Sequence, residues 1–191
     1  MGSRRLVGRR DQLARLDEAV RLADAGEPQF VVFGGESGVG KTRLMEHVAE
    51  RLESGGARVL RTRCVELGTQ GLPLAPLTTA LRQLVALLGA EALSRTLFGA
   101  DALVRLLPEY ADARPVEQDR ARLFALFAGL LQRLGAAHPL VWIIDDLHWS
   151  DRSTRDLIGY LARALTGSRI LVLTAYRDDY TERHHPLRPF L

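Results

Sequence analysis

The chain is poor in cysteine and lacks long hydrophobic runs. Cys64 is the single cysteine among 191 residues, which excludes an internal disulfide and fits a reducing compartment. No apolar segment of the signal-peptide type stands at its start, and no apolar run approaches the roughly 20 residues that span a membrane. We therefore expect a cytoplasmic protein without a membrane partner, in which Cys64 is a small buried hydrophobe.

Lysine is as scarce as cysteine. Of the 26 basic residues only Lys41 is a lysine, and the formal net charge is +3. The arginines are dispersed among acidic residues, which argues against a nucleic-acid-binding surface. Hydrophobic residues at 47% and charged residues at 26% are ordinary values for a globular chain. We expect one domain, residues 1–191, with a substantial core.

The sole lysine lies in a stretch that fits the pattern G-x-x-x-x-G-K-[ST] of a phosphate-binding loop. An apolar, β-branched run precedes this stretch, and apolar residues at helical spacing follow it. We therefore expect the loop to join a buried strand to a helix. A glycine-rich loop without a ligand is the alternative. The predicted nucleotide-binding residues are Gly35, Glu36, Ser37, Gly38, Val39, Gly40, Lys41, Thr42 and Arg43.

Each residue type in this loop suits phosphate chemistry. Glycines allow backbone N–H groups to turn inward and approach phosphate oxygens, and the helix N-terminus adds a favourable potential. Lys41 can reach the β- and γ-phosphates as a compact point charge. Thr42 can place its hydroxyl on Mg²⁺, which prefers oxygen ligands.

Strands and helices alternate along the chain. In chain order we predict a helix at 11–25, a strand at 29–34, a helix from the loop to about residue 54, a strand at 57–64, a helical insertion at 65–137, a strand at 140–144, a helix at 152–165 and a strand at 169–176. This order predicts a three-layer α/β/α fold with a mainly parallel sheet, the fold of P-loop NTPases. The helical insertion then lies between the second and third strands.

Three boundaries in this scheme carry specific expectations. Within the insertion, the clearest helix runs over 115–134, and Gly135 is expected to end it. Ser150 or Asp151 is the expected N-cap of the helix at 152–165. The polar stretch 178–191 reads as a loop that enters a further element.

Two acidic residues end the most apolar strand. We expect Asp145 to hold Mg²⁺ together with Thr42, and Asp146 to orient or deprotonate the attacking water. Helix capping or a solvated turn is the alternative for both. Arg177 follows the last strand, where a guanidinium could contact the γ-phosphate; a solvated strand-end arginine is the alternative. Because ligands bind beyond the carboxyl ends of parallel strands, all these residues should converge on one edge.

Several segments together resemble a known family. They are VGRRDQL at 7–13, GESGVGKTRL at 35–44, GLPLAPLTTALR at 71–82, LVWIIDDLHWSD at 140–151 and LVLTAYRDD at 171–179. This set is similar to the ATPase domain of the large, MalT-like LuxR-family transcriptional regulators, which belong to the STAND ATPases and are close to the AAA-type ATPases. The resemblance extends over nearly the whole chain.

The resemblance implies a nucleotide switch. ADP would hold the full-length protein inactive, and ATP with an inducer would permit self-association and transcription activation through a C-terminal DNA-binding domain that this chain lacks. Val7, Gly8 and Arg9 would lie near the adenine and ribose, and Arg177 would match the sensor arginine of the family. Full members continue past this length with a fifth strand and a lid, so we expect a C-terminally truncated domain.

Three functions remain open from the residues. The first is a slow Mg-dependent ATPase whose hydrolysis times a switch. The second is a module that binds ATP or ADP without turnover. The third is the same ATPase module joined to a different output, such as a cyclase or a protein kinase.

Overall fold

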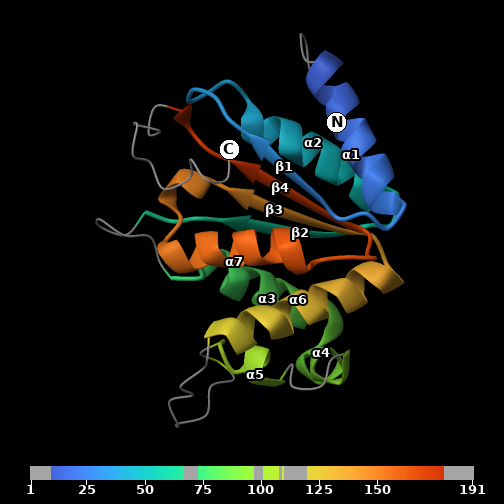
Figure 1. Ribbon diagram of the computed structural model, residues 1–191, viewed down its shortest axis with the longest axis vertical. Helices are drawn as coiled ribbons and strands as arrows, with labels where there is room; N and C mark the ends of the chain where they lie inside the picture. Colours follow the sequence, from blue (N-terminus) through green and yellow to red (C-terminus); the bar gives the residue numbers. More distant parts are fainter. Residues whose placement is uncertain (1–9, 67–72, 97–100, 108, 110–119, 179–191) are drawn as a thin grey trace.

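The computed structural model describes residues 10–66, 73–96, 101–107, 109 and 120–178 (Figure 1). Its four strands form one parallel sheet in the order β1-β4-β3-β2. The strands are β1 (Gln29–Phe33), β2 (Arg58–Arg63), β3 (Leu140–Asp145) and β4 (Ile170–Ala175). The helices are α1 (Arg10–Asp24), α2 (Lys41–Ser54), α3 (Ala75–Leu88), α4 (Ala90–Thr96), α5 (Asp101–Val104), α6 (Arg120–Ala137) and α7 (Arg152–Ala164), and a 3₁₀ turn, η2, spans Leu147–Trp149. The predicted order of elements is confirmed.

The sheet separates two hydrophobic cores. Every residue of β3 is buried, and because successive side chains point to opposite faces, the strand serves both cores. Val141 and Ile143 pack with residues of α1 and α2. Trp142 and Ile144 pack with residues of α3, α6 and α7. Figure 1 shows the result, with α1 and α2 on one face of the sheet and the other helices on the opposite face, so the three-layer α/β/α prediction is confirmed.

Trp142 anchors the sheet to the helices between β2 and β3. Its indole lies edge-on to the ring of Phe127 in α6, at 5.4 Å between ring centroids. Its Nε1 donates to Thr62 Oγ1 at 3.0 Å, and that hydroxyl donates to the carbonyl of Ile143 at 2.7 Å. The buried polar atoms of this contact are therefore satisfied. The helices α3 to α6 lie between β2 and β3, where the helical insertion was expected.

The predicted end of α6 at Gly135 is wrong. The helix continues to Ala137, with Gly135 buried inside it. A Cβ at this position would lie 2.7 Å from Cγ1 of Ile170 in β4. The glycine therefore allows close approach of the helix to the strand and does not terminate the helix.

β1 is also less buried than expected. It pairs with β4 on one side and forms an edge of the described sheet. Val32 is 38% exposed, whereas every residue of β4 is buried. An apolar, β-branched sequence is shared by edge and central strands, so composition alone did not separate the two.

Some predicted positions lie outside the described residues. They are Val7, Gly8 and Arg9, the first part of the helix expected at 115–134, and the stretch after Asp178. Among the residues that the structure describes, no helix is long and apolar enough to cross a membrane.

Candidate functional site

The phosphate-binding loop connects the carboxyl end of β1 to the N-terminus of α2. Gly38 and Gly40 adopt positive φ angles of 78° and 84°, which glycine reaches without steric cost. Gly40 is the N-cap of α2, so the helix begins at Lys41. At Gly34 a Cβ would overlap the phenol ring of Tyr176, which follows β4. The loop therefore lies directly beside the end of β4.

The Lys41 ammonium lies inside the loop. Its Nζ donates to the carbonyl of Gly35 at 2.6 Å and to the carbonyl of Glu36 at 2.8 Å. An ammonium has three donors and no acceptor, so both contacts are exchangeable for other oxygens. Lys41 can thus turn from the two carbonyls to a phosphate placed in the loop.

Thr42 and Asp145 meet across the sheet edge. The Thr42 hydroxyl at the start of α2 donates to Oδ2 of Asp145 at 2.9 Å, although 103 residues separate the two. Asp145 is 6% exposed, and its other oxygen, Oδ1, accepts from the backbone N–H of Asp146 at 2.9 Å. A hydroxyl and a carboxylate are oxygen donors of the type that Mg²⁺ prefers. The pairing predicted from the sequence is formed.

Asp146 follows in an uncommon backbone conformation and meets an arginine that the sequence reading did not select. Its φ of 53° and ψ of 43° are left-handed, which is rare for a residue with a side chain. Arg63, at the end of β2, places Nε 3.4 Å from Oδ2 of Asp146 and Nη2 3.7 Å from Oδ2 of Asp145. The strand pairing explains the contact, since Arg63 is in register with Asp145.

Lys41, Thr42 and the acidic pair line one cavity of about 240 Å³. Arg177 lies in its wall, together with Ala175 and Tyr176 from the end of β4 and the start of the following segment. The predicted convergence of the loop, the acidic pair and Arg177 is therefore confirmed. The wall comprises Ser37, Gly38, Gly40, Lys41, Thr42, Arg43, Asp145, Asp146, Ala175, Tyr176 and Arg177. Glu36 and Val39 of the loop are exposed and do not line it.

Burial and nearby carboxylates shift the pKa values of Cys64 and Tyr176, which lie beside the site. Cys64 follows β2, and its backbone N–H donates to the carbonyl of Asp145 at 3.0 Å. Burial, reinforced by the carboxylates of Asp151, Asp146 and Asp145, raises the pKa of the Cys64 thiol to about 12. Burial and the nearby Asp178 carboxylate also raise the pKa of Tyr176. The thiol is therefore protonated at neutral pH and unsuited to nucleophilic chemistry.

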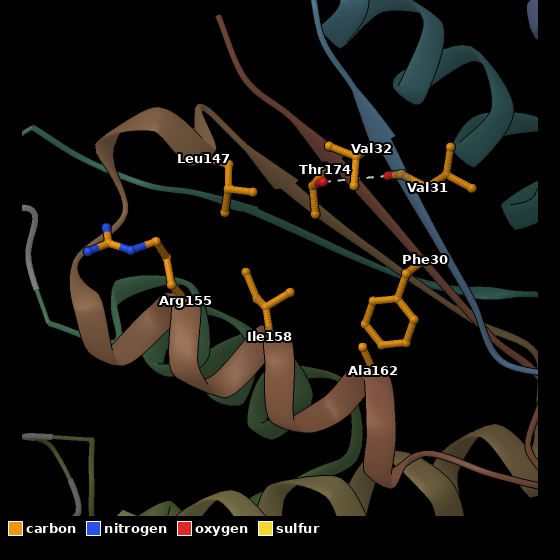
Figure 2. A pocket seen from close by; sticks show the side chains of 8 residues that line it. All are labelled: Phe30, Val31, Val32, Leu147, Arg155, Ile158, Ala162 and Thr174. Atoms are coloured by element: carbon orange, nitrogen blue, oxygen red, sulfur yellow. Dashed lines mark hydrogen bonds between the residues drawn. The ribbon is translucent and has the colours of Figure 1, made fainter. Parts of the chain in front are cut away.

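A second, apolar cavity lies beneath β1. Figure 2 shows Phe30 and Val32 of β1 pointing toward α7, with Ile158 and Ala162 facing them. Its volume is about 90 Å³. Arg155 lies at one end, and its guanidinium donates to the carbonyl of Ser150. This cavity lacks the converging polar groups of a nucleotide site, so the phosphate chemistry belongs to the first cavity.

Loop, hydroxyl–carboxylate pair and parallel sheet together define a domain of the P-loop NTPase type. The order of the strands and the position of the loop after β1 place the candidate site where such folds bind ligands. The chain belongs to the AAA ATPase domain family, whose model matches residues 5–173.

Solved structures show the same fold at low sequence identity. The ORC2 protein of Aeropyrum pernix is 19% identical, with a TM-score of 0.53 over 96% of this chain and 45% of that one. Cdc6p of Pyrobaculum aerophilum is 17% identical, with a TM-score of 0.52 over 93% of this chain and 41% of that one. An uncharacterised protein of Rhizobium meliloti (strain 1021), R02095, is 25% identical over 92% of this chain. The chain spans 19% of the length of R02095.

Proposed function

We propose that this AAA ATPase domain binds Mg–ATP, hydrolyses it slowly and acts as a nucleotide switch. The hydrogen bond of 2.9 Å between Thr42 and Asp145 is the observation that carries the proposal. It joins the phosphate loop to the acidic strand end, and both line the same cavity as Lys41. A phosphate-binding loop alone explains anion binding, whereas the added hydroxyl–carboxylate pair explains a requirement for a hard cation.

The proposed roles of these residues rest on where their side chains lie in the cavity. Lys41 would exchange its two carbonyl contacts for β- and γ-phosphate oxygens. Thr42 and Asp145 would hold Mg²⁺, which when bound neutralises charge on the phosphates. Asp146 would orient the attacking water and accept its proton, and Arg177 would contact the γ-phosphate.

The remaining nucleotide contacts rest on the loop motif for the glycines and on the family resemblance for Val7, Gly8 and Arg9. Gly35, Gly38 and Gly40 would direct backbone N–H groups at phosphate oxygens. Val7, Gly8 and Arg9 would lie near the adenine and ribose, and Arg43 would border the site from the first turn of α2. Adenine nucleotides are the proposed ligands. The structure of the Aeropyrum pernix ORC2 protein, which has the same fold, was solved in complexes with ADPNP and ADP.

The resemblance of the motifs to LuxR-family regulators supports a transcriptional output. In this proposal ADP keeps the full-length protein inactive, and ATP permits self-association and DNA binding through a separate C-terminal domain. A cyclase or protein kinase output would use the same ATPase domain. The match to only 19% of R02095 is compatible with an output in other segments of a longer protein.

Two substitutions test the site directly. Lys41→Ala should weaken ADP binding by at least about tenfold in isothermal titration, because the single ammonium of the loop is removed. Asp146→Asn should keep binding and lower phosphate release from ATP by about a hundredfold. Equal ADP affinity in Lys41→Ala would refute nucleotide binding at this loop, and unchanged turnover in Asp146→Asn would refute the role of Asp146.

A module that binds nucleotide without turnover is the second candidate. The Arg63 contact with Asp146, at 3.4 Å, favours it, because the guanidinium lies against Oδ2, an oxygen that would otherwise be open to a water molecule. The same assay separates the two candidates. Tight ADP binding with phosphate release no faster in the wild type than in Asp146→Asn would establish the binding module.

A further inference from the structure

The turn after β3 holds Asp146 in a strained but well-supported geometry. Asp146 is the N-cap of η2 and has a left-handed backbone, with φ of 53°. Its carbonyl accepts from the N–H of Trp149 at 2.9 Å. A left-handed non-glycine residue costs on the order of 1 kcal/mol or more, so the surrounding contacts must stabilise it. Such strain concentrates at functional positions, which raises the question of what fixes the Asp146 side chain.

His148 is the buried neighbour of that side chain. Its ring is completely inaccessible to solvent, and Nε2 lies 4.0 Å from Oδ1 of Asp146. The ring also packs against Trp149, with 5.1 Å between centroids. Burial and the aromatic contact limit the movement of the imidazole, and its Nε2 edge lies toward the carboxylate.

Arg63 approaches the same carboxylate from the other side. It contacts Oδ2, whereas His148 faces Oδ1. The Arg63 side chain is 63% exposed, and exposed ion pairs of this kind contribute little and rearrange easily. The buried imidazole is therefore the better candidate for a permanent orienting group.

We propose that His148 is a positioning residue for Asp146. The inference rests on the proposed function, in which Asp146 orients and deprotonates water. The Nε2 edge of the ring donates to Oδ1 when the side chain of Asp146 turns toward it, which shortens the separation by about 1 Å to hydrogen-bond length. This contact leaves Oδ2 to face the water once Arg63 has moved away.

Paired substitutions separate positioning from packing. His148→Leu fills the buried volume without a donor, whereas His148→Gln keeps an amide N–H near the position of Nε2. We expect His148→Leu to lower kcat for phosphate release by about tenfold, with KM and the ADP Kd within twofold, and His148→Gln to retain most of the rate. His47→Leu, on the exposed face of α2, is the matched control and should leave the rate unchanged.

The result in the Asp146→Asn background is decisive for the mechanism. Adding His148→Leu to Asp146→Asn should reduce kcat no further, because the residue acts through that carboxylate. Wild-type kcat in His148→Leu, equal losses in both histidine variants, or a further loss in the double variant would overturn the proposal. A purely structural role for His148 predicts that Leu is tolerated at least as well as Gln.

A second measurement is independent of hydrolysis and of the histidine variants' folding. In protein with ¹⁵N-labelled imidazoles, Asp146→Asn should shift the His148 ring resonances and leave those of His47 in place. Unmoved His148 resonances would overturn the inference. If the wild type hydrolyses no faster than Asp146→Asn while the resonances shift, the hydrolytic role fails and the side-chain contact stands.

Discussion

At the scale of single residues, the pKa of Cys64 responds to burial and to the carboxylates near it. The thiol is 3% exposed, and this burial acts on its pKa together with the carboxylates of Asp151, Asp146 and Asp145. Both effects disfavour the thiolate in the folded state only. The unfolded chain releases this proton near the ordinary pKa of 9.0, whereas the folded chain keeps it until about pH 12.

This difference predicts a loss of stability at high pH. Between about pH 9 and pH 12 the unfolded state binds fewer protons than the folded state, so the free energy of unfolding falls as pH rises. The slope from this group approaches about 1.4 kcal/mol per pH unit. Urea unfolding of the wild type and Cys64→Ala at pH 8, 9, 10 and 10.5 should show a steeper decline for the wild type. Parallel declines would show that the thiol does not keep its proton in the fold.

The sequence predicted the phosphate loop, Thr42, Asp145, Asp146 and Arg177 because each stands at a fixed distance from a recognisable strand end. Arg63 and His148 escaped this reasoning for physical reasons. Arg63 contacts the acidic pair only because β2 lies beside β3 in register, although its place at a strand end was a usable signal. The His148 contact depends on the left-handed turn at Asp146, which spacing does not reveal.

At the scale of elements, Asp151 connects α7 to the start of α3. Its carboxylate accepts from the backbone N–H groups of Ser153 at 2.8 Å and Thr154 at 3.1 Å, which confirms it as an N-cap. It also accepts from the N–H of Leu74 at 3.2 Å, and Leu74 is left-handed, with φ of 53°. One side chain therefore fixes two helix beginnings that lie 77 residues apart.

Replacing Asp151 by alanine should destabilise the fold by about 2.5–4 kcal/mol. The loss combines about 1 kcal/mol for the cap with about 1.5–3 kcal/mol for the charge-assisted hydrogen bond to Leu74. Asp151→Asn keeps a capping oxygen and should lose less than half as much. Urea unfolding curves of both variants check the prediction. Asp156→Ala, at an exposed position of the same helix, is the control and should cost under about 0.5 kcal/mol.

Element types were predictable because β3 and β4 are uninterrupted apolar runs and α7 has apolar residues at helical spacing, each with clear ends. The end of α6 was not predictable from the sequence. A glycine that allows a helix to approach Ile170 closely cannot be distinguished in sequence from a glycine that ends a helix. The exposure of β1 was not predictable for a related reason. Its place at the sheet edge follows from the strand order, and strand order depends on contacts distant in sequence.

At the scale of the whole molecule, the residues of the site come from segments that lie far apart in the sequence. The loop follows β1, the acidic pair ends β3, Arg177 follows β4, and Arg63 ends β2. Each of the four described strands thus contributes a residue to the same edge, because parallel pairing places their carboxyl ends together. A ligand that bridges these residues binds the folded chain and not the unfolded one, so its affinity must appear in the stability of the entire domain.

Thermal unfolding with Mg–ADP should therefore report the metal site. At a hundredfold excess over Kd, binding contributes about 2.7 kcal/mol, which raises the Tm of a domain of this size by about 5–10 °C. Chelation of Mg²⁺ by EDTA should remove part of this shift in the wild type. In Asp145→Asn the remaining shift should be the same with and without EDTA, because the carboxylate paired with Thr42 is lost. Each variant is compared with its own nucleotide-free Tm, so a change in basal stability does not affect the result. An EDTA-sensitive shift of wild-type size in Asp145→Asn would place the metal on other residues.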